Sequence, residues 1–223
     1  TEYMDRVEAD YTGQEAQNLI NILTTNHTYF MREPEHFEFF KNVILPELKE
    51  QEKTGMDLRI WSAAASSGQE PYTIAMILKD FLGPEYNAWE TSVLATDISR
   101  KVLDSAVNGI YSAEQISTLP VWWRNSYFVP LPDGMYQVKK ELRQQVVFRQ
   151  FNLMNPLPFK KKMHVIFLRN VMIYFDETTK RKLVQRLYEF LEPGGYLIIG
   201  STENIDRSAV PLVYVRPSIF RKE

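Results

Sequence analysis

The chain has 223 residues, 44% of them hydrophobic, and a formal net charge of −2, which is typical of a globular protein with no global attraction to nucleic acid or to an anionic membrane. It contains no cysteine, which excludes disulfides, thiolate metal sites and a cysteine nucleophile. The three histidines lack metal-ligand spacing, and neither a signal peptide nor an apolar run of about 20 residues is visible, so we expect no metal, no membrane insertion and a cytoplasmic location.

Residues 1–25 are polar, with only a short helical pattern around Leu19, Ile20 and Leu23. Because the first residue is not methionine, we expect this part to belong to a longer protein. A helix is then predicted from Pro34 to about Glu52.

Residues 59–78, RIWSAAASSGQEPYTIAMIL, combine an apolar strand, a turn of small residues and an amphipathic helix. The strand is predicted at Arg59–Ala64, and apolar side chains at helical spacing follow from Ile74 onward. Small side chains at Ala65–Gly68 let a ligand approach the backbone and the free amides of the helix start. One glycine is too few for the dinucleotide pattern G-x-G-x-x-G, so the sequence favours a nucleoside without a pyrophosphate.

The alternation of strand and helix continues after this unit. A second strand is predicted at Trp89–Thr96, ending at Asp97. Ser99 is predicted to cap the next helix, which ends near Asn108 because Gly109 follows.

The section from about Ser112 to Gln150 interrupts the alternation with short strands. We predict them at Tyr127–Leu131, Met135–Lys139 and Val146–Phe151, with a Pro-Asp-Gly turn joining the first two. This pattern predicts a hairpin-rich insertion.

The alternating pattern then resumes and completes the predicted sheet. The predicted elements are a strand at Met163–Leu168, a helix carrying Leu183, Leu187, Phe190 and Leu191, a turn at Pro193-Gly194-Gly195, a strand at Tyr196–Ile199, and a hairpin of Leu212–Val215 with Ser218–Arg221. The fold class is therefore predicted to be α/β, with a doubly wound, mainly parallel sheet, a C-terminal antiparallel hairpin and a small inserted antiparallel subdomain.

Polar residues follow several predicted strands where these strands end, which is where open parallel sheets bind ligands. Asp97 is placed to accept hydrogen bonds from ribose hydroxyls, and Glu70 lies in the first turn of the helix after the first strand. The alternatives are that Asp97 is only a turn or cap acid and that Glu70 only complements the helix dipole. Asn152 and Leu153 are placed to bracket a planar purine, although an asparagine at a strand exit is more often a turn residue.

Arg169 and Asn170 directly follow four apolar residues, where a charge is costly unless it meets a partner. A structural ion pair and a carboxylate-bearing ligand would satisfy Arg169 equally well. Tyr174 follows at helical spacing and is either a site residue or a core residue.

The segment TTNHTYFMREP brings Asn26, Thr28 and Arg32 close together, although such clusters usually cap helices. Considered together, however, several strings are specific. They are NHTYFMRE, IWSAAASSGQEPYTIAM, ATDIS, FNL, FLRNVMIYF and GGYLIIGSTEN. In these strings, their order and their spacing, nearly the whole chain resembles the bacterial chemotaxis receptor methyltransferases, the CheR family.

This resemblance implies a doubly wound domain that binds S-adenosylmethionine, with a small antiparallel subdomain inserted into it and a helical domain before it. We expect residues 1–52 to be linker and helices that remain from a truncated N-terminal helical domain. Residues 53–223 are expected to form the methyltransferase domain, with the inserted β-subdomain at about 126–151. Gln69, Leu168 and Ser201-Thr202 replace residues frequent in the family, without removing a predicted cofactor contact.

The resemblance also assigns site residues. The family's cofactor contacts fall on Asn26, Thr28, Arg32, Glu70, Asp97, Asn152, Leu153, Arg169 and Asn170. Arg32 and Tyr174 occupy the positions nearest the transferred methyl group and are the candidate catalytic residues. No metal is implied.

The implied activity is methyl transfer from S-adenosylmethionine to glutamate side chains of chemoreceptors, giving glutamyl methyl esters for sensory adaptation and S-adenosylhomocysteine as product. Glutamate, with an ordinary pKa of about 4.3, is already an anion at neutral pH, so the reaction needs positioning rather than a general base. The implied partner is the cytoplasmic helical region of chemoreceptors, and we expect a monomer that binds no nucleic acid. The inserted subdomain is a candidate contact surface, but its short turn VPLPDGM leaves open whether it grips a receptor tail.

Two alternatives stay open at this point. A methyltransferase for another protein or a small molecule would share the cofactor domain, and an alkali-stable product would favour it. A non-catalytic signalling module would keep the fold and dock through the inserted sheet without needing to bind S-adenosylmethionine, which calorimetry would reveal.

Overall fold

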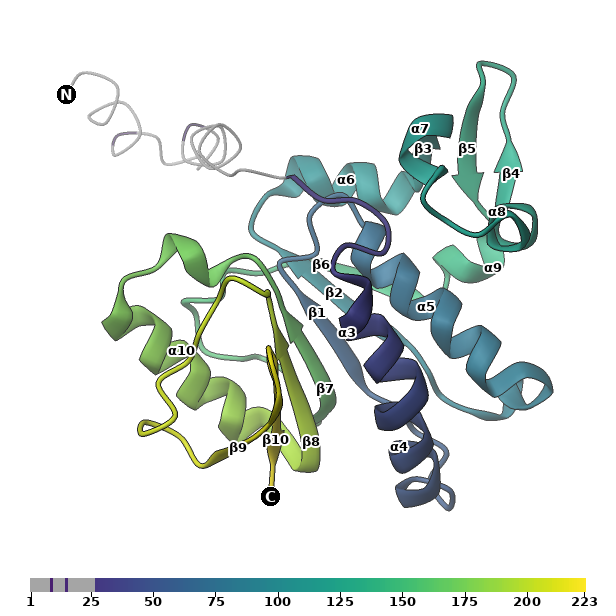
Figure 1. Cartoon of the computed structure of the whole chain (residues 1–223). Coiled ribbons are helices and arrows are strands. Elements are labelled where there is room, and N and C mark those ends of the chain that lie inside the picture. Colours follow the sequence, from purple (N-terminus) through teal and green to yellow (C-terminus); the bar gives the residue numbers. More distant parts are fainter. Residues whose placement is uncertain (1–8, 10–14, 16–26) are drawn as a thin grey trace.

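The computed structural model describes residues 9, 15 and 27–223, and its central element is a seven-stranded sheet of order β6-β2-β1-β7-β8-β10-β9 (Figure 1). The strands are β1 Ile60–Ala63, β2 Val93–Asp97, β6 Val146–Gln150, β7 Met163–Leu168, β8 Leu191–Ile199, β9 Leu212–Arg216 and β10 Ile219–Lys222. The first five of these pair in parallel, and β10 pairs antiparallel with β8 and β9. The predicted mainly parallel sheet with a C-terminal antiparallel hairpin is confirmed.

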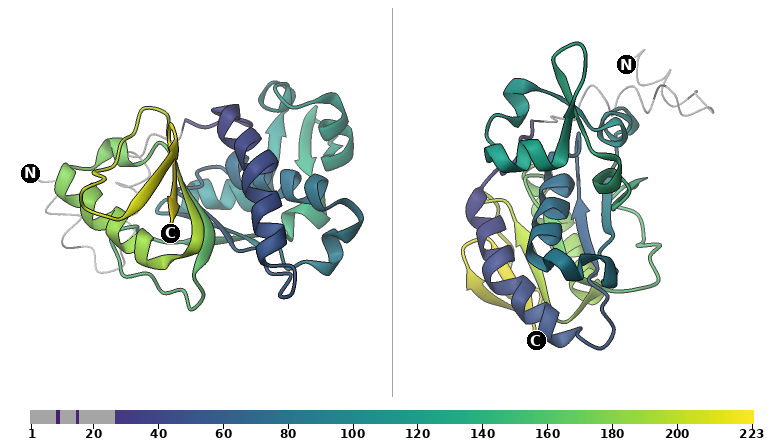
Figure 2. Two further views of the ribbon diagram at one scale, coloured as in Figure 1. Left: turned by 60° about the horizontal axis from the view of Figure 1, so that its bottom comes forward. Right: turned by 90° about the vertical axis from the view of Figure 1, so that its right-hand side faces the viewer.

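The central strands β1 and β7 are buried along their whole length because helices cover both faces of the sheet. The helical segments around this sheet are α3 Pro34–Phe39, η1 Phe40–Ile44, α4 Leu45–Gln51, α5 Gln69–Leu82, η2 Gly83–Ala88, α6 Arg100–Asn108, η3 Met172–Tyr174 and α10 Glu177–Phe190. Along β7, Val165 and Phe167 join the core under α3, α4 and α5, whereas Ile166 and Leu168 join the core under α10. Figure 2 shows α10 on the opposite side of the sheet from α3 and α4. The doubly wound arrangement is therefore confirmed.

The predicted helix at Pro34–Glu52 is present as α3, η1 and α4 in direct succession. Its first residues are fixed to the sheet by aromatic contacts, since the rings of Phe37 and Phe40 lie 5.9 and 5.3 Å from the ring of Phe167 in β7. This packing holds the segment before α3, residues 27–33, over the strand ends.

A second, antiparallel sheet of order β3-β5-β4 lies beside α5 (Figure 1). Its elements are β3 Ile110–Ser112, α7 Ala113–Ile116, α8 Val121–Tyr127, β4 Phe128–Pro130, β5 Met135–Val138 and α9 Lys140–Arg143. Asp80 of α5 accepts hydrogen bonds from the Trp123 indole nitrogen (2.6 Å) and the Tyr127 hydroxyl, both on α8. The small sheet is thereby attached to the main domain through α8.

The assignment of Val146–Phe151 to the inserted sheet is wrong. These residues form β6, which pairs in parallel with β2 at the edge of the main sheet, and the third strand of the small sheet is β3. The sequence predicts that this strand exists, but its pairing depends on register against a strand some fifty positions earlier, which no local pattern contains. The domain boundaries themselves stay predictions.

Two main-sheet strands begin several residues away from their predicted positions. Strand β2 begins at Val93 rather than Trp89, and β8 begins at Leu191 rather than Tyr196. The Pro-Gly-Gly sequence lies inside β8 as an irregularity in its pairing with β7. A Cβ on Gly195 would meet two carbonyl oxygens at 2.8 and 2.9 Å, so glycine permits this close passage.

The topology defines where a ligand is expected. Strand β1 continues to β2 on one side of the sheet, whereas β7 continues to β8 on the other. The crevice above the carboxyl ends of β1 and β7 is therefore a topological switch point, the usual ligand position in such sheets.

Candidate active site

A cavity of about 320 Å3 lies at these strand ends, near the lower end of the roughly 300–1,000 Å3 found for small-molecule sites. Nine of the ten predicted site residues line it: Thr28, Arg32, Glu70, Asp97, Asn152, Leu153, Arg169, Asn170 and Tyr174. The tenth, Asn26, lies outside the described residues. The fold thus gathers residues from segments far apart in the sequence around one space, while their individual roles stay predictions.

The backbone around the cavity adopts conformations that L-residues rarely take. Of seven non-glycine residues with positive φ in the described part, five lie at the cavity or in the segment over it. They are Met31 (58°), Glu33 (56°), Ala64 (71°), Ser66 (49°) and Asn170 (57°). Each such residue costs about 1–3 kcal/mol and persists only where the surroundings enforce it, which is typical of functional sites.

The turn between β1 and α5 is fixed from behind by α6 and β3. Gly68 has φ 97°, and a Cβ there would meet the Ala106 side chain and the Tyr111 hydroxyl, both at 2.9 Å. The same hydroxyl donates to the Ser67 carbonyl at 2.7 Å. The front of the turn, residues 64–66, is left to line the cavity.

Asp97 is 7% exposed at the end of β2, where its carboxylate accepts hydrogen bonds from the amides of Ser66 and Ser99, both at 2.9 Å. Burial raises the pKa of Asp97, and the amides of Ser99, Ser66 and Ile98 oppose this rise. Asp97 therefore does stabilise the neighbouring turns, as the alternative interpretation of the sequence expects. A carboxylate has about four lone-pair sites, however, so acceptor capacity is left for a ligand in the cavity.

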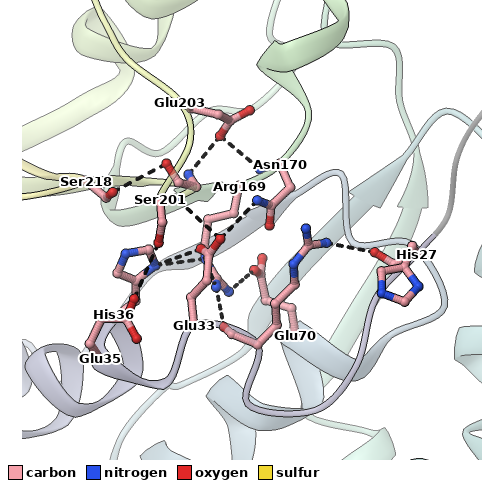
Figure 3. A network of polar contacts seen from close by, with 12 residues as sticks. His27, Glu33, Glu35, His36, Glu70, Arg169, Asn170, Ser201, Glu203 and Ser218 are labelled. Carbon is pink, nitrogen blue, oxygen red and sulfur yellow. Dashed lines mark hydrogen bonds and ion pairs between the residues drawn. The ribbon is translucent and has the colours of Figure 1, made fainter.

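The Arg169 side chain is 2% exposed and lies at the centre of a polar network (Figure 3). Its guanidinium donates to Glu70 (2.7 Å), to Glu33 (2.9 Å), to the Arg32 carbonyl and to Nδ1 of His36 (3.1 Å). The structural ion pair is therefore present, and these contacts use four of the five guanidinium donors.

Glu70 does more than complement the dipole of α5. One carboxylate oxygen accepts from Arg169, and the other accepts from the Ser62 hydroxyl of β1 at 2.7 Å. Because both partners are buried, Glu70 is held in a fixed orientation at the cavity wall.

Glu33 is part of the site although the sequence reasoning did not select it. It accepts from Asn170 Nδ2 (3.1 Å), the Ser201 amide (3.2 Å) and Arg169 (2.9 Å). Burial acts to raise its pKa, but the hydrogen bond from Asn170 and the Arg169 charge outweigh it and lower the pKa below its usual value. His36 and Glu203 were also missed. The sequence offered one indication that Glu33 belongs to the site, namely its position between the predicted site residue Arg32 and Pro34, the first residue of a predicted helix.

His36 makes the fold sensitive to acid. Burial, followed by the Arg169 charge, lowers its pKa to about 4. The unfolded chain, with a histidine pKa of about 6.5, therefore binds a proton between pH 6.5 and 4 that the folded chain does not, so stability falls as the pH drops through this window.

We expect urea unfolding to show a loss of roughly 2–3 kcal/mol from this group between pH 7 and 4.5. His36→Gln should remove that share of the slope, and His27→Gln, which changes an exposed side chain, should not. An unchanged slope in His36→Gln would contradict this account.

One wall of the cavity is apolar and suits a planar ring. It is formed by Ile98, Phe151 and Leu153, which follow β2 and β6. Asn152 lies between Phe151 and Leu153 in the chain. Its side chain accepts a hydrogen bond from the Met154 amide at 2.9 Å, so Asn152 does act as a turn residue, as one of the two interpretations of the sequence expects. Asn152 nevertheless lines the cavity.

Arg32 and Tyr174 lie at the mouth of the cavity. Arg32 donates to the His27 carbonyl at 2.8 Å, and its guanidinium lies 6.0 Å from the Tyr29 ring centre. The Tyr174 side chain is 57% exposed, so the core alternative for this residue is wrong. Tyr174 is therefore accessible from solvent, and Arg32 is partly exposed.

The described residues fit S-adenosylmethionine. A carboxylate suits the ribose hydroxyls, an apolar wall suits the purine, and a second carboxylate, Glu70, suits the amino group. Among the described residues no group of three or more His, Cys, Asp or Glu side chains is arranged to hold a metal. Nor does any helix in that part have the length and apolar character needed to cross a bilayer.

When the seven main-sheet strands are numbered along the chain, their order across the sheet is 3-2-1-4-5-7-6. The site lies at the switch point between the first and fourth of these strands. This is the fold and site of a class I S-adenosylmethionine-dependent methyltransferase. The family described as CheR methyltransferase, SAM binding domain, matches residues 26–215. The chain belongs to this family.

Relatives with this family's activity in their names are similar over most of the chain. A chemotaxis protein methyltransferase of Borreliella burgdorferi is 43% identical, covering 100% of this chain and 79% of the relative. One of Escherichia coli is 39% identical, covering 91% of this chain and 69% of the relative. A solved structure of the glycopeptide N-methyltransferase MtfA has 17% identity and a TM-score of 0.39, covering 71% of this chain and 48% of that one, a likeness too weak to support any conclusion.

Proposed function

We propose that the protein methylates glutamate carboxylates on the cytoplasmic helical region of chemoreceptors, forming glutamyl methyl esters for sensory adaptation. The observation that carries this proposal is the meeting of nine predicted site residues around one cavity in a chain of the CheR family. The relatives' names, which specify chemotaxis, support a receptor as the acceptor.

The cofactor roles follow from the chemistry of the cavity wall. Asp97 accepts from the ribose hydroxyls, Asn152 and Leu153 border the purine, and Glu70 accepts from the amino group, with Thr28 nearby. Arg169 and Asn170 hold Glu70 and Glu33 in place beside the amino-acid part of the cofactor. S-adenosylmethionine supplies an electrophilic methyl group on a sulfonium when bound.

The acceptor side of the reaction is assigned to Arg32 and Tyr174 at the mouth. The glutamate acceptor is already an anion at neutral pH, so no residue has to remove a proton. Attack on the methyl carbon is in line, which makes orientation and exclusion of water the main tasks of these side chains. Arg32 is partly exposed besides its contact with the His27 carbonyl, and such a cation orients a carboxylate without burying its charge.

The small sheet is proposed as a second contact surface for the receptor. Val121 and Trp122 on α8 are 61% and 53% exposed, which supports an apolar contact there. We propose further that the protein acts in the cytoplasm as a monomer.

The function is tested by incubating the protein with methyl-labelled cofactor and a receptor cytoplasmic fragment, followed by mass spectrometry of the acceptor peptide. We expect label on glutamate that is lost in alkali, because a methyl ester hydrolyses and an N-methyl group does not. Alkali-stable label, or no transfer by a protein that binds the cofactor, would contradict the proposal.

Substitutions at the mouth should separate turnover from cofactor binding. We expect Tyr174→Phe to lower kcat about 10-fold and Arg32→Ala roughly 100-fold, because each removes a group that orients the acceptor. Calorimetric affinity for S-adenosylhomocysteine should change little in Tyr174→Phe. Near-normal methylation by Arg32→Ala would count heavily against these roles.

A further inference from the structure

Glu203, a carboxylate outside the predicted site, lies next to Asn170 (Figure 3) and accepts hydrogen bonds from four backbone amides. One oxygen accepts from the amides of Met172 (2.6 Å) and Ile173 (3.3 Å). The other accepts from the amides of Asn170 (2.9 Å) and Gly200 (2.7 Å). Asn170 lies in the turn after β7, Met172 and Ile173 are the first two residues of η3, and Gly200 directly follows β8.

The segment after β7 carries three site residues, since Arg169 and Asn170 directly follow the strand and Tyr174 ends η3. Amides in such a turn have no strand or helix partner of their own, and burying an unpaired amide costs about 1–3 kcal/mol. Glu203 supplies the acceptor for three amides of this segment, those of Asn170, Met172 and Ile173, the last of which directly precedes Tyr174. Glu203 therefore braces the backbone that leads into Tyr174.

The turn and the end of β8 are also pressed together closely. A Cβ on Gly200 would lie 2.5 Å from Asn170 Nδ2, 2.9 Å from the Asn170 amide and 2.9 Å from a Glu203 oxygen. Asn170 has φ 57°, a conformation that needs outside support. Glycine at position 200 thus allows the backbone to pass close to Asn170, and Glu203 joins the two segments because it accepts from both amides.

Glu33 holds the same turn from the opposite side. Its carboxylate accepts from Asn170 Nδ2 (3.1 Å) and from the Ser201 amide (3.2 Å). Two carboxylates, one before α3 and one after β8, therefore bracket Asn170. Glu33 also bonds Arg169, whereas Glu203 bonds only the turn and the β8 end in the contacts described, so Glu203 is the cleaner residue to vary.

We infer that Glu203 is a positioning residue for methyl transfer, which sets the place of Tyr174 at the mouth through the amides of residues 170, 172 and 173. This inference rests on the proposed function for its kinetic part. Glu203 itself does not line the cavity. Its effect on turnover should therefore be indirect, mainly through Tyr174, with the Asn170 amide as its second link to the site.

The test is a double-mutant cycle of Glu203→Gln with Tyr174→Phe on the full chain. The amide group of glutamine turns a donor toward one pair of backbone amides, so at least one pair loses its acceptor. We expect Glu203→Gln to lower kcat about 10-fold with S-adenosylhomocysteine affinity changed less than about 3-fold, because displacement by a fraction of an ångström affects orientation more than binding. In the Tyr174→Phe background the further loss should shrink to less than about 2-fold.

Asp206→Asn is the matched control. Asp206 lies in the same loop after β8 and bonds Ser208 and Arg181, away from the turn, so its variant should keep normal kcat. A purely structural Glu203 would lower the melting temperature while leaving kcat per folded protein unchanged. That result, or equal losses from Glu203→Gln in both backgrounds, would overturn the inference.

Two further measurements keep the test decisive. Amide hydrogen exchange should speed up at residues 170, 172, 173 and 200 in Glu203→Gln, and this readout stands even if no receptor glutamate is methylated. If Glu203→Gln does not fold, Gly200→Ala disturbs the same contact with the carboxylate in place, and it should give the same kcat loss and the same dependence on Tyr174. Unchanged exchange, or unchanged kcat in Gly200→Ala, would refute the role of Glu203.

Discussion

Replacing Arg169 by methionine is expected to lower the free energy of unfolding by about 3–5 kcal/mol, because the change removes one partner of a buried ion pair and leaves the others charged. Glu70 and Glu33 have 13% and 16% exposed side chains, so water cannot replace the guanidinium fully. Urea unfolding at pH 7 measures the loss. The pKa of Glu33 should also rise, because Arg169 is one of the groups that hold it down.

The chain offers a matched control in Arg181, whose side chain is 61% exposed and pairs with Asp206 at 2.7 Å. Arg181→Met should cost less than about 1 kcal/mol, as exposed pairs usually do. Arg169→Lys keeps the charge but cannot make the same set of contacts, so we expect an intermediate loss. Equal losses for Arg169→Met and Arg181→Met would show that the network contributes little.

The sequence predicted the mainly parallel sheet and candidate residues along the cavity wall because strand ends follow from local patterns. A strand end is marked by a polar residue after an apolar run, and parallel strands bring such ends to one edge of the sheet. Asp97 and Arg169 could be found in this way. The resemblance to the CheR family added Thr28, Arg32 and Tyr174, whose own patterns also allow a cap or a core position.

The sequence could not predict how these residues bond one another. The choice between a structural ion pair and a ligand contact for Arg169 depends on Glu33, which lies 136 positions away in the chain. Glu203 was missed for a similar reason, since its partners are backbone amides, which carry no side-chain signal. The pairing of β6 with β2 likewise depends on register across the main sheet. Long-range contacts of this kind are what the structure adds.

Asp97→Ala is expected to weaken S-adenosylhomocysteine binding by roughly 100-fold. Hydrogen bonds to a charged acceptor contribute about 1.5–3 kcal/mol each, and a loss of about 2.7 kcal/mol corresponds to 100-fold in Kd. The substitution will also lower stability by leaving the amides of Ser66 and Ser99 without their acceptor. Calorimetry has to be performed where the variant is folded, at a temperature well below its melting transition.

A cofactor analogue separates the ribose role of Asp97 from its role in the turn. The wild type should bind S-adenosylhomocysteine much more tightly than an analogue without the 2′- and 3′-hydroxyls, by roughly the same 100-fold. In Asp97→Ala the two ligands should bind almost equally, because the group that distinguishes them is gone. If Asp97 only holds the turn, the variant will lose affinity for both ligands by the same factor and keep the wild-type ratio. That outcome would place the ribose elsewhere and leave Asp97 as the acceptor that joins the turn after β1 to the end of β2.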